Sequence, residues 1–184
     1  MDTNKTVVIV NGKGGVGKDT LCGYFCKYYS GRIVSSIAPI KKLAKRLGWK
    51  GGKEDADRKF LSDLKFIMDD YKNTSMTYLI DQFKAFLKED RAILFVMIRE
   101  PDNIEKFKEY VENAGIRAYT LLIRRSSVSK KFGNVADDEC ENYAYDYIFD
   151  NDGSIAQGHN DFVIMVTNIT SEAGINEKEV FEID

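Results

Sequence analysis

The sequence contains very little histidine and cysteine. His159 is the only histidine in 184 residues, and it lies outside the motifs described below, where we expect it at the surface. This excludes nucleophilic catalysis by a Ser-His-Asp or Cys-His arrangement. The three cysteines are Cys22, Cys26 and Cys140, and an odd number without an export signal is typical of reduced thiols in a cytosolic protein. A structural zinc site would need two ligands more than Cys22 and Cys26 supply.

Long apolar runs are also missing. None reaches the roughly 18 residues that a membrane span needs, and the first five residues contain no apolar core of a signal peptide. We therefore expect a cytoplasmic protein without a membrane partner. Lys plus Arg number 27 and Asp plus Glu 29, for a net charge of −2, which disfavours a nucleic-acid partner bound through bulk charge. The length predicts a single domain, 1–184, and the sequence leaves the oligomeric state open.

Short apolar runs rich in β-branched residues alternate with segments of helical periodicity. The run at residues 6–10 is typical of a strand that is buried on both faces. Pro39 and Pro101 each stand where the next helix is expected to begin. The alternation predicts an α/β fold with a mostly parallel sheet, and the ambiguous tail at 162–166 favours helix. The predicted strands are 6–10, 32–35, 92–98, 118–123 and 145–149.

A glycine-rich segment directly follows the first strand and precedes a helix. It fits the pattern G-x-x-x-x-G-K, and a strand before it and a helix after it are the context in which that pattern binds phosphate. Backbone N–H groups and the helix N-terminus would contact the phosphate oxygens of ATP, and Lys18 would reach the β- and γ-phosphates. The expected ATP-binding residues are Gly12, Lys13, Gly14, Gly15, Val16, Gly17, Lys18, Asp19 and Thr20.

The position after Lys18 usually carries Ser or Thr, whose hydroxyl binds Mg²⁺. Here Asp19 occupies it and Thr20 follows one residue later. We therefore expect Mg²⁺ to be held by Asp19, Thr20, Glu100 and water.

Cationic residues follow the predicted strands at their carboxyl ends, where ligands bind in open parallel sheets. Lys41 follows the second strand, Arg99 ends the third, and Arg124 and Arg125 follow the fourth. We expect Lys41, Arg99 and Arg58, which lies near the start of a predicted helix, to bind the phosphate of an acceptor. The expected catalytic residues are Lys18, Arg99, Arg124 and Arg125.

The segment 124–142 is polar and lacks clear periodicity. Its first half is basic and its second half acidic. We interpret it as a lid whose basic half closes on phosphates and excludes water, and whose acidic half holds the arginines when no nucleotide is bound. A solvated surface loop is the other interpretation, because charge runs commonly form one.

Four segments carry a resemblance to known kinases. Gly17-Lys18-Asp19-Thr20 resembles the G-K-D-[ST] loop of deoxynucleoside monophosphate kinases and phosphomevalonate kinases. The segment 36–41 is similar to their Pro-hydrophobic-Lys segment, and Arg99 to the Arg of their Asp-Thr-Arg segment. The segment 146–154, with Asn151, is similar to their final strand and Asn-x-Gly turn. Together these cover residues 6 to 155, and one departure is Met97, which stands where those families have Asp.

The resemblance implies a three-layer P-loop NTPase fold with a five-stranded parallel sheet, in the order 2-3-1-4-5, flanked by helices. It implies ATP and Mg²⁺ as cofactors, Asn151 as a further nucleotide-binding residue, and a small phosphorylated acceptor. We favour a (deoxy)nucleoside monophosphate, with phosphomevalonate as the alternative. Transfer between two phosphates needs mainly positioning and charge neutralisation.

Two other classes of function remain open. The segment 13–18 matches the deviant loop of partitioning-type switch ATPases, in which the early lysine acts across a dimer; against this, Asp19 replaces the expected Thr and no Asp-rich switch segment follows. A non-catalytic nucleotide sensor is the second class, because Met97 supplies no carboxylate.

Overall fold

The computed structural model describes residues 5–52, 54–128 and 140–172. Its centre is one five-stranded sheet in which all neighbouring strands are parallel. The order β2-β3-β1-β4-β5 confirms the predicted order and fold class. The strands are β1 (Thr6–Asn11), β2 (Gly31–Ser35), β3 (Ile93–Met97), β4 (Arg117–Arg124) and β5 (Tyr147–Asp150).

The central strands form as the sequence predicts, and the last strand differs at its start. Every residue of β1 and β3 is buried, as expected for continuous β-branched and apolar runs with helices on both faces. Strand β5 begins at Tyr147 and not at Tyr145. The Tyr145 hydroxyl donates to the Cys140 carbonyl oxygen at 2.6 Å, and the Asp146 carboxylate accepts from Thr120. These two side chains thus bind neighbouring segments just before β5. The hydrogen bonds between β5 and β4 begin only at Tyr147.

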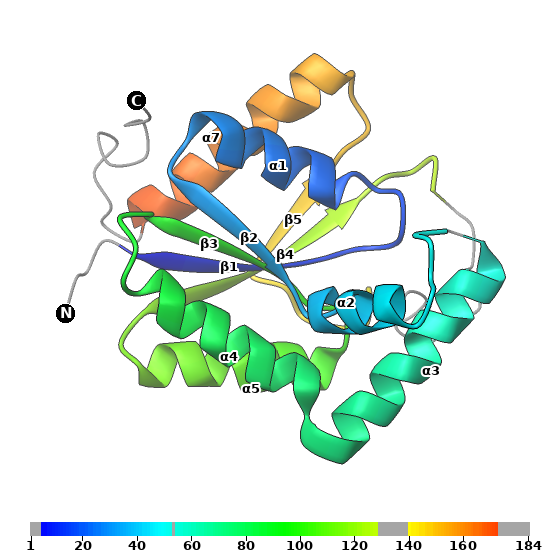
Figure 1. Ribbon diagram of the computed structural model, residues 1–184. Coiled ribbons are helices and arrows are strands. Elements are labelled where there is room, and N and C mark those ends of the chain that lie inside the picture. The colour runs from blue at the N-terminus through cyan, green and yellow to red at the C-terminus, as the bar shows by residue number, and fades with distance from the viewer. Residues whose placement is uncertain (1–4, 53, 129–139, 173–184) are drawn as a thin grey trace.

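Two pairs of helices cover the two faces of the sheet (Figure 1). Helices α1 (Lys18–Tyr28) and α7 (Ile155–Glu172) lie on one face, and α4 (Thr74–Phe86) and α5 (Pro101–Asn113) on the other. Side chains of a strand alternate between faces, so Val8 and Phe95 pack in the core under α1 and α7. Val7 and Leu94 pack in the core over α4 and α5.

Helix α7 confirms the helix favoured for the tail. It also corrects the expectation for His159, which is half-buried rather than a surface residue. Its ring stacks on Tyr24 of α1, with centroids 3.9 Å apart and planes 13° apart, because α1 and α7 pack side by side on the same face of the sheet. No described helix is both long and apolar enough to cross a membrane.

Two further helices follow β2 at the carboxyl edge of the sheet. They are α2 (Ala38–Arg46) and α3 (Asp55–Lys72), and α3 projects from the body of the molecule (Figure 1). Trp49 joins them, because its Nε1 donates to Asp57 Oδ1 at 2.8 Å. The described fold is thus a sheet with helices on both faces, and α2 and α3 extend it at the edge beyond β2.

Candidate functional site

The glycine-rich loop between β1 and α1 has positive φ at three glycines, and at two of them a side chain would also meet a close neighbour. Gly12 and Gly17 have φ values of 140° and 99°, a region that side chains disfavour. A Cβ on Gly12 would lie 2.2 Å from the carbonyl oxygen of Ile123, and one on Gly17 would lie 2.6 Å from Asn151 Nδ2. The loop is therefore packed tightly against the end of β4 and against Asn151.

The ammonium of Lys18 lies inside this loop. Its Nζ donates to the carbonyl oxygen of Lys13 at 2.7 Å and to that of Gly12. Lys18 is also the first residue of α1, so its positive charge adds to the partial positive charge of the helix N-terminus. Backbone amides, a helix N-terminus and an ammonium thus converge in one loop, which is an arrangement that binds phosphate.

Asn151 stabilises the shape of the loop. Its Nδ2 donates to the carbonyl oxygen of Val16 at 2.8 Å, and its own backbone N–H donates to the carbonyl oxygen of Arg124 at 2.9 Å. The sequence predicts Asn151 as a nucleotide-binding residue. In the structure its amide binds the loop itself, so it connects the β5–α7 turn, β4 and the phosphate loop.

Asn11 is a functional residue that the sequence analysis missed. It is fully buried, and its Oδ1 accepts from the backbone N–H of Gly12 at 2.8 Å. Its Nδ2 donates to the carbonyl oxygen of Arg99 at 2.9 Å and to the Tyr145 hydroxyl at 2.7 Å. Asn11 therefore fixes the start of the loop relative to the end of β3. The available signal was an amide at the end of an otherwise apolar strand, directly before the first glycine.

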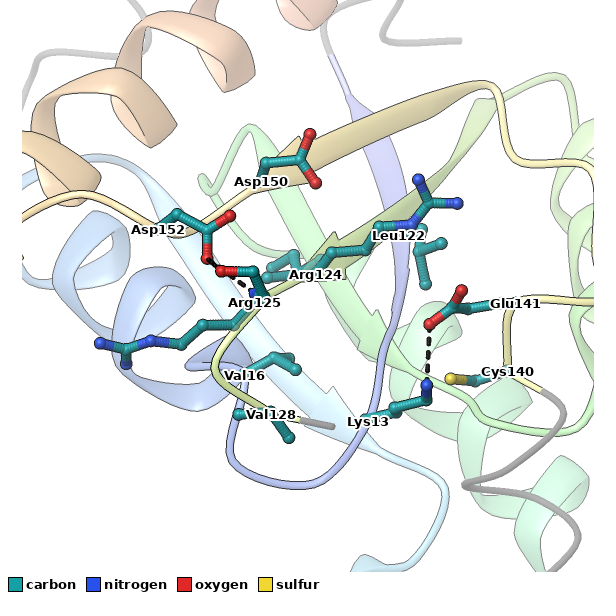
Figure 2. A pocket seen from close by; sticks show the side chains of 12 residues that line it. Lys13, Val16, Leu122, Arg124, Arg125, Val128, Cys140, Glu141, Asp150 and Asp152 are labelled. Atoms are coloured by element: carbon teal, nitrogen blue, oxygen red, sulfur yellow. Dashed lines mark hydrogen bonds and ion pairs between the residues drawn. The ribbon is translucent and has the colours of Figure 1, made fainter. Parts of the chain in front are cut away.

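A cavity of about 340 Å³ opens between the loop and the ends of β4 and β5 (Figure 2). The side chains of Arg124 and Arg125 extend in opposite directions there, and the Nε of Arg124 is buried without a hydrogen-bond partner among the described residues. The side chains drawn around the cavity include positive and negative groups, namely Lys13, Arg124, Arg125, Glu141, Asp150 and Asp152.

Ion pairing at the rim differs from the expected pattern. Lys13 Nζ lies 3.0 Å from Glu141 Oε1, so the one described acidic residue of the segment 124–142 pairs with the loop lysine and not with an arginine. Residues 129–139, the middle of the predicted lid, lie outside the described residues.

At the start of the segment, Asp152 Oδ1 accepts from Ser126 N at 2.7 Å and Ser126 Oγ at 2.8 Å. These bonds hold the pKa of Asp152 below its ordinary value.

Of the three expected Mg²⁺ ligands, two are neighbours on α1 and the third forms an ion pair with a lysine. Asp19 and Thr20 are exposed at the start of α1, next to the loop. Glu100 Oε1 lies 3.0 Å from Lys65 Nζ. Among the described residues no three acidic, histidine or cysteine side chains form a metal-binding group.

The remaining expected acceptor residues stand on the helices at the edge of the sheet. Lys41 is exposed on α2, and Arg58 is half-buried in the first turns of α3. The structure thus places Lys13, Lys18, Arg124 and Arg125 around the loop and the cavity, and Lys41 and Arg58 on separate helices beyond β2.

Lys65 is the second residue that the sequence analysis missed. Its side chain is only 13% exposed and pairs with both Asp69, at 2.8 Å, and Glu100. Burial lowers the pKa of Lys65, but the two carboxylates outweigh this and raise it above its ordinary value. The only sequence signal is an i,i+4 Lys–Asp spacing, which Lys59 and Asp63 share on the surface.

Comparisons with known proteins support the fold. No protein-family model and no curated protein matches this sequence. A solved structure of a candidate kinase from Chloroflexus aurantiacus is 13% identical, with 93% of this chain and 99% of that chain covered and a TM-score of 0.58. A sugar kinase from a Janibacter species is 11% identical, with 91% and 97% covered and a TM-score of 0.51.

A tunicamycin resistance protein from Deinococcus radiodurans is 8% identical, with 97% and 99% covered and a TM-score of 0.51. Identities this low show a shared fold, and a shared fold does not by itself imply a shared function. Together with the sheet order β2-β3-β1-β4-β5, these likenesses show that the chain shares the α/β fold of these solved structures.

Proposed function

We propose that this protein is an ATP-binding phosphotransferase that moves the γ-phosphate of ATP to a small phosphorylated acceptor. The observation that carries the proposal is the loop of residues 12–18. Its positive-φ glycines, the Lys18 ammonium and the start of α1 converge on one point, and this is a strong anion site. The cationic residues at the carboxyl edge of the sheet provide further charge for a second phosphate group.

The acceptor that we favour is a (deoxy)nucleoside monophosphate, and phosphomevalonate is the alternative. The support is the resemblance of the loop and of the Asn151 turn to nucleotide kinases. The packing of Asn151 against Gly17 and Val16 adds a physical reason why these two segments occur together. Arg99, with Lys41 and Arg58, would bind the acceptor phosphate.

The chain's own residues would supply positioning and charge. Lys18 would bind the transferred phosphoryl group, and Arg124 and Arg125 would neutralise charge from the side of the cavity. The chemistry that bound Mg²⁺ would supply is neutralisation of negative charge on the phosphates. Asp19 and Thr20 fit Mg²⁺ as exposed oxygen donors beside the loop, whereas Glu100 would first have to leave Lys65.

The experiment that tests the proposal is a coupled assay with ATP and each ribo- and deoxyribonucleoside monophosphate, with phosphomevalonate as a further acceptor. We expect turnover with one class of acceptor. In parallel, calorimetry with MgATP should show binding to the wild type and a large loss of affinity in Lys18→Ala. Identical behaviour of the two proteins, with no heat from either, would refute the proposal.

A nucleotide sensor is the second candidate, and one observation favours it. Met97, at the end of β3, is only 7% exposed and packs in the core, so this strand presents no carboxylate beside the loop. A sensor would bind MgATP in the same calorimetric experiment but would transfer phosphate to no acceptor. The acceptor assay therefore separates the two candidates.

A further inference from the structure

Helix α3 is not held in place by a buried apolar stripe. None of its 18 residues is buried, and Phe66 and Tyr71 are 73% and 72% exposed. A surface helix ordinarily fixes its rotation about its own axis by burying one apolar face. Helix α3 projects from the edge of the sheet (Figure 1). The Trp49–Asp57 hydrogen bond holds its first turn, and another contact orients its second half.

That contact is a cluster of three charged residues, which we call the α3 anchor: Lys65, Asp69 and Glu100. Lys65 Nζ lies 2.8 Å from Asp69 Oδ2 and 3.0 Å from Glu100 Oε1. Asp69 Oδ1 also accepts the backbone N–H of Ser75 at 2.7 Å, at the start of α4. Hydrogen bonds between charged groups are stronger and more directional than those between neutral ones. The anchor therefore joins the middle of α3 to the starts of α4 and α5.

The anchor also determines where Arg58 faces. Arg58 and Lys65 are seven residues apart, which is two helical turns, so both lie on the same face of α3 and about 10.5 Å apart along its axis. Glu100 directly follows Arg99, where β3 leaves the sheet at its carboxyl edge. When Lys65 binds Glu100, the face of α3 that carries Arg58 is turned toward the edge of the sheet that also carries Arg99.

We propose that the Lys65–Glu100 ion pair positions α3 so that Arg58 and Arg99 face one acceptor phosphate. This inference rests on the proposed function as a phosphotransferase. Lys65 is a positioning residue, because both its ion pairs are to carboxylates of this chain and it acts through Arg58. Affinity for the acceptor therefore depends on Lys65, whereas affinity for ATP, which the glycine-rich loop binds, does not.

The chain offers a matched control within the same helix. Lys59 and Asp63 form an i,i+4 pair at 2.7 Å, just as Lys65 and Asp69 do, but their side chains are 76% and 58% exposed. Exposed pairs of this kind contribute little to stability. Lys59→Met thus removes the same charge and the same type of helical pair as Lys65→Met, without touching the anchor.

The kinetic test compares Lys65→Met, Lys65→Arg, Lys59→Met, Arg58→Ala and the double variant Arg58→Ala/Lys65→Met. We expect Lys65→Met to raise the KM for the acceptor about tenfold, equivalent to about 1.4 kcal/mol, with the KM for ATP unchanged. Lys65→Arg should restore most of the loss, and Lys59→Met should match the wild type. The double variant should be no worse than Arg58→Ala, because Lys65 acts through Arg58. Equal rises in both KM values, or additive effects in the double variant, would overturn the proposal.

A second readout does not depend on catalysis. Hydrogen exchange of α3 amides should become faster in Lys65→Met than in the wild type, since local opening no longer has to break the anchor, and Lys59→Met should leave it unchanged. If the wild type phosphorylates no acceptor, the proposed function fails while this measurement still decides whether the anchor holds α3. Unchanged exchange in Lys65→Met would overturn the positioning role by itself.

Discussion

Replacing Asn11 with Ala is the sharpest test of how the phosphate loop is held. Asn11 has no exposed surface, and its amide makes three hydrogen bonds, to Gly12 N, to the carbonyl oxygen of Arg99 and to the Tyr145 hydroxyl. The Tyr145 hydroxyl retains its bond to the Cys140 carbonyl oxygen after the substitution. The N–H of Gly12 and the carbonyl of Arg99 lose the partner that Asn11 gave them.

The expected loss follows from these two groups. A buried polar group that loses its partner costs about 1–3 kcal/mol, so Asn11→Ala should lower the free energy of unfolding by about 3 kcal/mol. For a chain of this length, that corresponds to a fall in Tm of roughly 6–12 °C. Because Gly12 begins the loop, affinity for MgATP should fall together with stability.

The assay is urea unfolding with a circular dichroism readout, together with MgATP calorimetry on the folded variant. The midpoint should shift while the m-value stays the same, because the surface exposed on unfolding does not change. Asn160→Ala is the control, since Asn160 is exposed on α7 and should lose nothing. A loss for Asn11→Ala below about 1 kcal/mol would mean that water satisfies both groups, and would refute the account of the loop.

Four further predictions follow from single contacts. Gly17→Ala should abolish MgATP binding in calorimetry, because φ is 99° and the new Cβ would lie 2.6 Å from an amide nitrogen. Replacing Arg124 and Arg125 together with Ala should lower kcat at least about tenfold if they neutralise transition-state charge; unchanged turnover would contradict this. Burial raises the pKa of Asp146, but hydrogen bonds from Thr120 and Lys108 outweigh it and hold the pKa below its ordinary value. Its contribution to stability is therefore present above the unfolded-state pKa and lost as the pH falls through the folded-state pKa, and Asp146→Asn should flatten the acid limb of a plot of unfolding free energy against pH. Finally, burial raises the pKa of Cys26 to about 12, so native protein at pH 8 should react slowly with a thiol reagent at this position and rapidly once unfolded; a fast native reaction would argue against the packing of α1.

The sequence carried enough information to predict the fold because its signals are local. The β-branched run at 6–10 and the two prolines at helix starts need no knowledge of the rest of the chain. The glycine loop could likewise be placed between a strand and a helix from its neighbours alone. Strand order came from the resemblance, and the observed order confirms it.

The details of the site depend on contacts between residues far apart in the chain. Asn11 meets Tyr145 across 134 residues, and Asn151 meets Val16 across 135. Neither pairing leaves a periodic pattern, so composition and spacing could not single out Asn11. The expectation that the acidic half of the segment 124–142 holds arginines differs from the structure at Glu141, which pairs with Lys13 of the loop.

The sequence by itself determined that a strand, a glycine loop with Lys18 and a helix follow one another, because steric limits on the backbone and hydrophobic periodicity act over a few residues. Only the tertiary structure decided that Glu100 meets Lys65 of α3. The fold brings the second half of α3 close enough to the start of α5 for these two side chains to pair at 3.0 Å. Which charged side chains pair depends on which of them lie close together in the folded protein, and spacing along the sequence does not show this.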